Sequence, residues 1–216
     1  MNFKKYYKFY FLDSLMEIQD IQDHYNRFKP IIKQRIIEFE ERGKKGEKEI
    51  FRELCFCLLT AGTSAELGIK TIDYLGETIF NGNEEDIIKK LEEIYRFHHV
   101  RGRFIFLARQ NFDINILNLS PIERREEIVK KIKGIGYKEA SHFLRNIGYK
   151  NYAILDKHII NCLYELGVLE NNIPPKNPKN YLEFEKKMKQ FSKDIGIDFD
   201  ELDLVLWSFK TGKVLK

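Results

Sequence analysis

The sequence predicts an all-α protein built of two helical lobes. Three observations predict this class: apolar residues recur at helical spacing in one segment after another, helix start and stop signals bracket these segments, and strand-like alternation is almost absent. The chain has 216 residues, of which 43% are apolar. This length and composition suit one domain or two small lobes around a buried core.

The chain up to Ile132 contains three well-marked helical segments. Residues 48–60, KEIFRELCFCLLT, are apolar nearly all round, which predicts a buried central helix. Asn83 precedes EEDIIKKLEEIY, where an acidic first turn leads into apolar residues at helical spacing. Residues 120–123, SPIE, match a capping box with proline at the first helical position, so a helix is expected from there to about Ile132. Arg124 and Arg125 are expected on its solvated face.

Three further helices are expected in the second half, and each ends at a glycine. Gly148, Gly167 and Gly196 occupy these stop positions. Residues 170–180, ENNIPPKNPKN, are loop-like in composition and could join two lobes. We therefore expect one domain over residues 15–216 with two helical subdomains, preceded by an extension, residues 1–14, to which the sequence assigns no role.

Composition excludes several classes of protein. Thirty-seven Lys and Arg against 33 Asp and Glu leave a charge of only +4, so attraction to a polyanion must come from a local patch. Cys55, Cys57 and Cys162 are too few and poorly spaced for an iron–sulfur cluster or a structural zinc, and are expected as reduced core residues. No apolar run approaches the roughly 20 residues that span a bilayer. The start of the chain matches a signal peptide only poorly. This favours a cytoplasmic protein without a membrane partner.

The stretch KGIGYKEASHFLRNIGYKNYAILDKH, residues 133–158, carries the clearest motif. Gly134 and Gly136 join two predicted helices, and their lack of side chains lets backbone N–H groups close on a phosphate. The alternative is a tight turn that binds nothing. A dinucleotide-binding turn fails because no strand precedes the glycines and GxGxxG is incomplete. A local basic cluster favours phosphate, and it consists of Lys133, Lys138, Arg145 and Lys150.

IKGIGYKEA followed by AILDKHI resembles the helix–hairpin–helix plus Gly/Pro-Asp motif of the DNA glycosylase superfamily, which includes endonuclease III and the 8-oxoguanine glycosylases. The segments ELCFCLLTAGTSA and YRFHHVRGRFIFLAR also resemble this superfamily. The chain resembles the archaeal-type 8-oxoguanine group of this superfamily in two features, its tail LDLVLWSFKTGKVLK and its lack of cluster-binding cysteines. The chain departs from the motif where NYAIL, not Gly-Pro, precedes Asp156.

This resemblance implies a helical fold with a DNA-binding cleft between the lobes, in which a flipped base is excised. It makes Lys138 the nucleophile and Asp156, 18 residues later, the carboxylate that assists it. Either residue alone could be merely a surface lysine or a helix cap. The implied contacts to DNA comprise a phosphate site at Lys133, Gly134 and Gly136 and a DNA-facing turn at Phe97, His98 and Arg101.

Recognition of the base is expected to involve the chain's end. Trp207 could stack on the flipped purine, and the terminal carboxylate of Lys216 could accept the N7–H that distinguishes 8-oxoguanine from guanine. The alternative is that Trp207 belongs to the core. His98 and His99 lack a third ligand at metal spacing, so no metal site is expected.

Together these features predict a monomeric DNA glycosylase with AP-lyase activity, which acts on double-stranded DNA containing oxidised guanine. It requires no cofactor, although the resemblance makes a monovalent cation at the hairpin carbonyls a candidate. Two alternatives stay open. One is a glycosylase for another oxidised base, and the other is a non-catalytic helix–hairpin–helix DNA-binding module.

Overall fold

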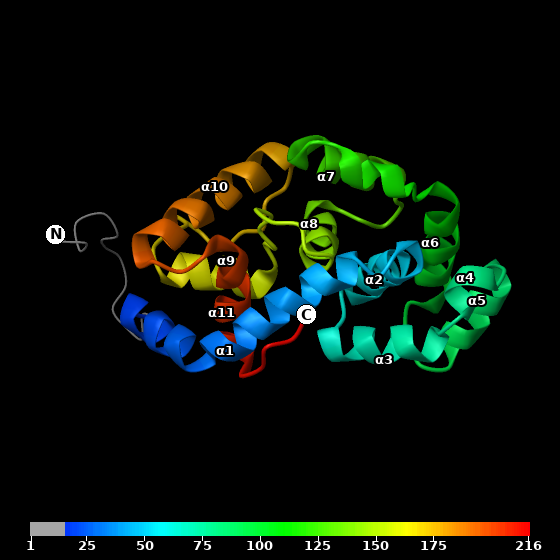
Figure 1. Ribbon diagram of the computed structural model, residues 1–216, viewed down its shortest axis with the longest axis horizontal. Helices are drawn as coiled ribbons and strands as arrows, with labels where there is room; N and C mark the ends of the chain where they lie inside the picture. The colour runs from blue at the N-terminus through cyan, green and yellow to red at the C-terminus, as the bar shows by residue number, and fades with distance from the viewer. Residues whose placement is uncertain (1–15) are drawn as a thin grey trace. The chain divides into compact units, whose positions relative to one another are not determined.

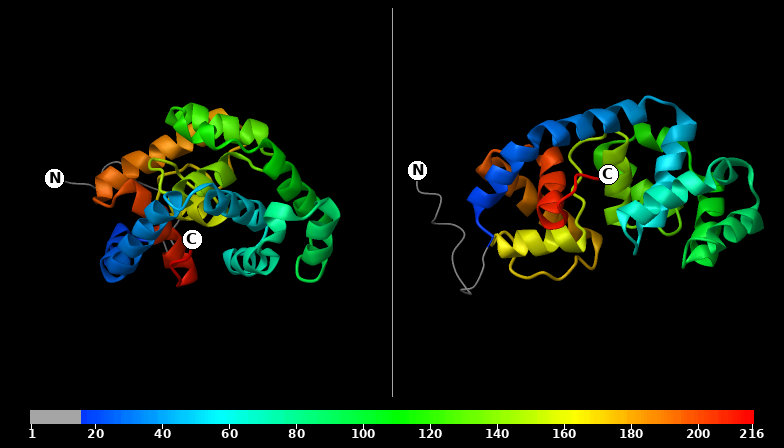
Figure 2. Two further views of the ribbon diagram at one scale, coloured as in Figure 1. Left: turned by 45° about the vertical axis from the view of Figure 1, so that its right-hand side comes forward. Right: turned by 90° about the horizontal axis from the view of Figure 1, so that it is seen from below.

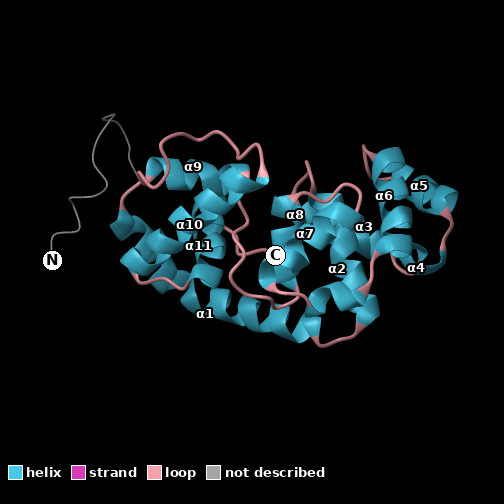
Figure 3. Cartoon of the chain, turned by 90° about the horizontal axis from the view of Figure 1, so that it is seen from above, coloured by secondary structure: helices cyan, strands magenta, loops and turns pink. Residues whose placement is uncertain are grey.

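The computed structural model describes residues 16–216, and this part of the chain is helical with no strand (Figure 3). The predicted all-α class is therefore confirmed, whereas the extension at residues 1–14 lies outside the described residues. The helices in chain order are α1 Ile18–Gly43, α2 Glu47–Thr60, α3 Ala65–Leu75, α4 Thr78–Asn81, α5 Glu84–Glu92, α6 His98–Asn111, the 3₁₀ helix η2 Ile114–Asn118, α7 Pro121–Lys131, α8 Tyr137–Asn146, α9 Lys157–Glu165, α10 Pro178–Ile195 and α11 Phe199–Thr211.

The chain divides into two compact units. The terminal unit contains the described residues up to Glu38 together with Lys150–Lys216, and the middle unit contains Phe39–Tyr149. Residues 170–177 of the predicted loop lie between α9 and α10 inside the terminal unit, whereas residues 178–180 already form the start of α10. The division between the units falls elsewhere, within α1 and after Tyr149.

Helix α2 forms the centre of the middle unit, as its all-round apolar sequence predicts. Its residues from Leu54 to Leu59 are fully buried, and the helix contacts α3, α6 and α8 (Figure 1). Burial of these side chains removes apolar surface from water at about 25 cal/mol per Å², which is the main force that assembles the unit. Within this unit α7 also packs on α8 and on η2.

Local signals correctly place the starts of α5 and α7. The Asn83 side chain accepts the Asp86 N–H at 3.0 Å, and Asp86 accepts the Asn83 N–H at 2.9 Å, so α5 begins with a capping box. Ser120 does precede Pro121 at the start of α7, but the predicted capping box is wrong. The Ser120 hydroxyl makes no cap to the backbone and donates instead to the Glu123 carboxylate at 2.5 Å.

In the terminal unit, α11 contacts both α9 and α10 (Figures 1 and 2). Helix α10 ends at Gly196, whose φ of +71° lies in the left-handed region that favours glycine. The core of this unit includes Leu163, Phe191 and Leu206, all of them fully buried.

The three cysteines are free and buried, as predicted. Burial raises the pKa of the Cys55 thiol and raises that of Cys162 to about 12, so both thiols stay protonated and unreactive. Within residues 16–216, no helix is long and apolar enough to cross a membrane.

Candidate active site

The predicted hairpin joins α7 to α8 in the middle unit. Gly134 has a φ of +90°, and a Cβ built on it would lie 2.2 Å from the Phe104 ring, so both its conformation and its surroundings require glycine. The Ile135 N–H donates to the Ile132 carbonyl at 3.2 Å and closes the turn. Gly136 has an ordinary φ of −101° and caps the start of α8. Only the first of the two glycines therefore uses the left-handed region.

A hydrogen bond from a buried arginine connects the two helices of the hairpin. Arg125 of α7 is only 2% exposed and donates to the Ser141 hydroxyl of α8 at 3.2 Å. That hydroxyl donates to the Tyr137 carbonyl at 2.8 Å, and the Tyr137 phenol donates to Glu126 of α7 at 3.2 Å. The expectation that Arg125 lies on a solvated face is wrong, because the packing of α8 on α7 covers it.

Lys138 is the second residue of α8, so it follows the hairpin directly. Its side chain is 31% exposed, and its Nζ lies 3.0 Å from Oε1 of Glu139. The other oxygen of Glu139 accepts the Gly136 N–H at 3.2 Å. One carboxylate therefore contacts both the hairpin turn and the amine. The positive end of the α8 dipole lies at this turn, where it favours anions such as phosphate.

Asp156 is the N-cap of α9 in the terminal unit. Its Oδ1 accepts the Ile159 N–H at 2.8 Å, and its side chain is partly exposed. Residues 152–155 lead into it as a buried segment without regular secondary structure. The Tyr181 hydroxyl donates to the Ala153 carbonyl at 2.7 Å and accepts the Leu155 N–H at 3.3 Å. Two hydrogen bonds to Tyr181 of α10 thus fix the segment before Asp156, where the chain has no Gly-Pro.

Of the four cations predicted to form a basic cluster around the hairpin, three lie at the surface. Lys133 and Lys150 are exposed, and Lys138 is partly exposed. Arg145 is only 5% exposed, and its guanidinium lies 4.4 Å from the centre of the Phe39 ring. Placing Arg145 in a phosphate-binding patch is therefore wrong, because it faces the core from the end of α8.

The predicted DNA-facing turn lies at the start of α6. Phe97 is 40% exposed and Val100 is 52% exposed. His98 Nδ1 lies 3.2 Å from the Tyr95 carbonyl. Arg101 donates to the Ala61 carbonyl at 2.8 Å, which ties the turn to the end of α2. Among the described residues no group of three or more His, Cys, Asp or Glu side chains could hold a metal ion.

Trp207 lies on α11 in the terminal unit and is partly exposed, whereas its neighbour Leu206 is fully buried. The Thr211 hydroxyl donates to the Trp207 carbonyl at 2.9 Å near the end of this helix. Gly212 then ends α11 with a φ of +74°. Lys216 is partly exposed as well. The recognition roles of Trp207 and Lys216 stay predictions.

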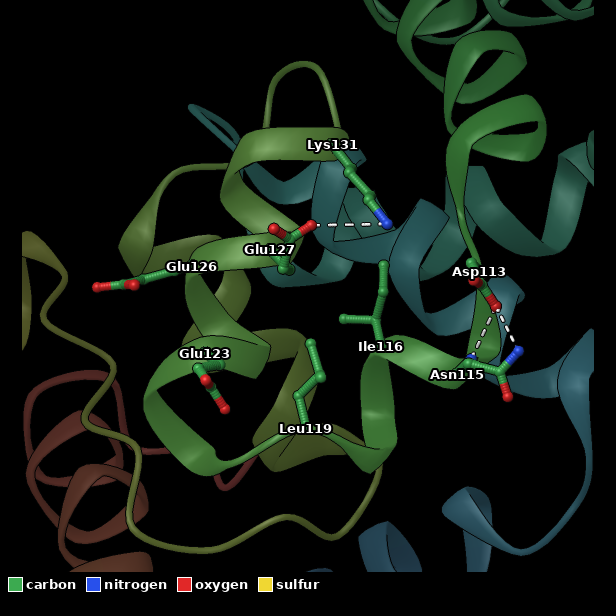
Figure 4. A pocket seen from close by; sticks show the side chains of 8 residues that line it. All are labelled: Asp113, Asn115, Ile116, Leu119, Glu123, Glu126, Glu127 and Lys131. Atoms are coloured by element: carbon green, nitrogen blue, oxygen red, sulfur yellow. Dashed lines mark hydrogen bonds and ion pairs between the residues drawn. The ribbon is translucent and has the colours of Figure 1, made fainter.

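A separate pocket of about 520 Å³ lies between η2 and α7 (Figure 4). It contains none of the predicted site residues, and its lining is acidic. Several of its carboxylates have partners within the pocket, such as Asp113 with Asn115 at 2.9 Å and Glu127 with Lys131 at 3.5 Å. Such a lining repels phosphate, so this pocket is not where DNA binds. Its lining residues are Asp113, Asn115, Ile116, Leu119, Glu123, Glu126, Glu127 and Lys131.

Sequence reasoning missed two supporting residues of the site. Glu139 could have been found, because a glutamate three residues after the N-cap glycine is the second half of a capping box. Tyr181 could not have been found, because no local signal connects it to the segment before Asp156. That contact spans 28 residues and exists only in the folded chain.

The model of the family described as 8-oxoguanine DNA glycosylase matches residues 32–197. The chain belongs to the 8-oxoguanine DNA glycosylase family. Among relatives of this family, an 8-oxoguanine DNA glycosylase/AP lyase of Korarchaeum cryptofilum is 44% identical over 196 residues, which are 88% of this chain and 93% of the relative. One of Methanocaldococcus jannaschii is 40% identical over 207 residues, which are 94% of this chain and all of the relative.

Solved structures of the 8-oxoguanine DNA glycosylase family agree with the fold. The M. jannaschii 8-oxoguanine glycosylase/lyase in complex with a 15mer DNA containing 8-oxoguanine matches with a TM-score of 0.87 and 40% identity, over 92% of this chain and 99% of that one. The 8-oxoguanine DNA glycosylase of Thermotoga maritima matches with a TM-score of 0.87 and 34% identity, over 92% and 98%. The family expected from the hairpin motif is thus confirmed.

Proposed function

We propose that this protein removes 8-oxoguanine from DNA and then cleaves the resulting abasic site by β-elimination. The observation that carries the proposal is Lys138, a reachable amine in the first turn after the hairpin. The chain also spans nearly the whole length of relatives named 8-oxoguanine DNA glycosylase/AP lyase. A lysine at the floor of a DNA site is the group that can form an imine with a sugar.

The reaction begins when the damaged nucleotide leaves the duplex, which costs about a few kcal/mol and least for a lesion. As the bond from C1′ to the base breaks, positive charge develops on the sugar, and the Asp156 carboxylate stabilises it. The neutral amine of Lys138 attacks C1′, and a proton passes from its nitrogen to O4′ as the C1′–O4′ bond breaks, which opens the sugar ring and leaves a protonated Schiff base. β-Elimination then breaks the strand on the 3′ side.

We propose that the hairpin binds the DNA backbone through Lys133, Gly134 and Gly136. The Gly136 N–H donates to Glu139 in the DNA-free chain, so a phosphate that approaches this turn would compete with that carboxylate. We propose that the exposed Phe97 and the partly exposed His98 supply a turn for further DNA contact, and that the bond from Arg101 to the Ala61 carbonyl stabilises this turn. These contacts are independent of base identity.

Recognition of the oxidised base is assigned in this proposal to Trp207 and Lys216. An aromatic ring stacked on the base contributes about 1–3 kcal/mol. A charged acceptor such as the terminal carboxylate bonds strongly to the N7–H of 8-oxoguanine. The partly exposed positions of both residues are compatible with these roles.

The decisive experiment is borohydride trapping on a duplex that contains 8-oxoguanine. Reduction of the Schiff base leaves the protein covalently joined to DNA, and Lys138→Gln abolishes this product, because an amide forms no imine. A variant that is trapped as well as the wild type would remove Lys138 from its role. A protein that binds duplexes in a salt-sensitive way without excision or trapping would be the non-catalytic module instead.

Asp156→Asn tests the carboxylate separately from the fold. Asparagine caps helices as well as aspartate does, so the bond to the Ile159 N–H is retained while the charge is lost. We expect duplex binding to persist and base excision to fall by about 10²–10³-fold. Unchanged excision would exclude Asp156 from the reaction.

The remaining features of the proposal concern substrate range and assembly. Competition between duplexes with different lesions separates 8-oxoguanine from an oxidised pyrimidine as the preferred substrate. A monovalent cation at the hairpin would use carbonyls such as that of Ile132, which has a second lone pair besides the one bonded to Ile135. Its test is duplex binding with potassium or with a bulky organic cation at equal ionic strength. We propose a cytoplasmic monomer, for which light scattering with and without DNA is the test.

A further inference from the structure

Helix α8 is buried along most of its length, and one accessible strip remains. Every residue from Ala140 to Asn146 is buried except His142, which is partly exposed. The first turn of the helix is also accessible, and it contains Lys138. His142 therefore lies beyond the first turn, where burial would be expected, yet its imidazole remains within reach of solvent.

Lys138 and His142 lie on the same face of the helix. Residues four apart are neighbours one turn along, with Cβ atoms separated by about 5–6 Å. The edge of the Phe56 ring contacts the imidazole, with ring centroids 5.7 Å apart and planes inclined by 74°. Phe56 belongs to the buried centre of α2 and is fully buried. A rigid ring thus supports a histidine next to the proposed nucleophile.

We propose that His142 is a further catalytic residue, the general base of the β-elimination step. This inference rests on the proposed function, because it needs a sugar bound to Lys138. When Lys138 Nζ is bonded to C1′, the next sugar carbon, C2′, is one bond away from the imine. An imidazole one helical turn from the lysine is placed at the distance at which it can reach the hydrogen on C2′.

The step balances without any additional reactant. The neutral imidazole nitrogen takes the proton from C2′. The electron pair of that C–H bond forms the C1′=C2′ double bond, while the π pair of the iminium moves onto nitrogen and gives an enamine. The enamine then expels the 3′ phosphate, whose oxygen leaves with the electron pair of the C3′–O bond.

The test uses the full-length protein and a duplex with a pre-formed abasic site, which needs no base recognition. Two products are measured in the same single-turnover reaction: the borohydride-trapped adduct, which reports the imine, and the cut strand, which reports elimination. For His142→Gln and His142→Ala we expect wild-type formation of the imine and a roughly hundredfold slower cut. The trapped adduct therefore accumulates.

Added imidazole provides the control for a merely structural effect. It should restore part of the cutting rate in His142→Ala, leave the wild type unchanged and give nothing with Lys138→Gln. A wild-type cutting rate in both histidine variants would overturn the inference. So would a parallel loss of imine and cut, because His142 would then support the fold rather than the elimination step. If the wild type itself forms no imine, the proposed function fails instead.

Discussion

Replacing Gly134 with alanine is expected to weaken both the fold of the middle unit and its grip on DNA. A residue with a side chain at φ of +90° loses about 1–2 kcal/mol relative to glycine. The new Cβ would lie 2.2 Å from Cδ2 of Phe104, and such overpacking costs about 1–3 kcal/mol more. The sum is about 2–5 kcal/mol, which lowers the melting temperature by roughly 4–20 °C for a chain of this size.

Alanine substitutions at two other glycines separate the backbone cost of a positive φ from the steric cost of the added Cβ. Gly62 has a φ of +85° with no other group within 4 Å of an added Cβ, so Gly62→Ala should cost only the backbone term of about 1–2 kcal/mol. Gly136 has a φ of −101°, and an added Cβ meets only a Glu139 oxygen at 3.2 Å. Gly136→Ala should cost less than about 1 kcal/mol, the usual price of alanine at an N-cap.

The assay is thermal unfolding followed by circular dichroism, together with affinity for an undamaged duplex. We expect Gly134→Ala to melt well below Gly62→Ala and to bind all duplexes more weakly, since the turn that presents its N–H groups is displaced. Equal melting of these two variants would refute the reasoning, because it would mean that the Phe104 ring moves aside at no cost. Normal duplex affinity in a destabilised Gly134→Ala would refute the phosphate role of the turn.

Three other changes test separate parts of the molecule. Tyr181→Phe removes the donor to the Ala153 carbonyl, and should cost about 1–3 kcal/mol in urea unfolding and slow base excision, whereas unaltered stability would show that water replaces the hydroxyl. Trp207→Ala should strongly reduce excision of 8-oxoguanine while cutting at a pre-formed abasic site survives, and equal losses on both substrates would point to a folding defect. Burial lowers the pKa of His24 below its ordinary value of about 6.5. Folding therefore favours the neutral imidazole. The stability that His24 contributes is present above its ordinary, unfolded-state pKa and is lost as pH falls through the lowered pKa of the folded state. Urea unfolding midpoints should drop less on acidification in His24→Gln than in the wild type.

The sequence by itself determined six of the helices, the hairpin and the family. The six are α2, α5, α7, α8, α9 and α10. Helical spacing, capping residues and terminal glycines act within a few residues of each other, so they can be read along the chain without knowledge of the fold. Lys138 and Asp156 can be proposed as site residues from the sequence in the same way, because one follows the hairpin directly and the other starts the next helix. Their proposed chemistry depends on residue type and spacing, and both are visible in the sequence.

Only the tertiary structure decided which charged and polar side chains face inward. Arg125 and Arg145 look like surface cations in the sequence, yet α8 covers the first and Phe39 of α1 packs on the second. The contacts of Tyr181 and His142 also depend on the fold. Tyr181 binds the Ala153 carbonyl, 28 residues away, and His142 packs against the Phe56 ring of α2. Burial and hydrogen bonding depend on segments distant along the chain, and the local sequence does not show which of these segments will pack against a given residue.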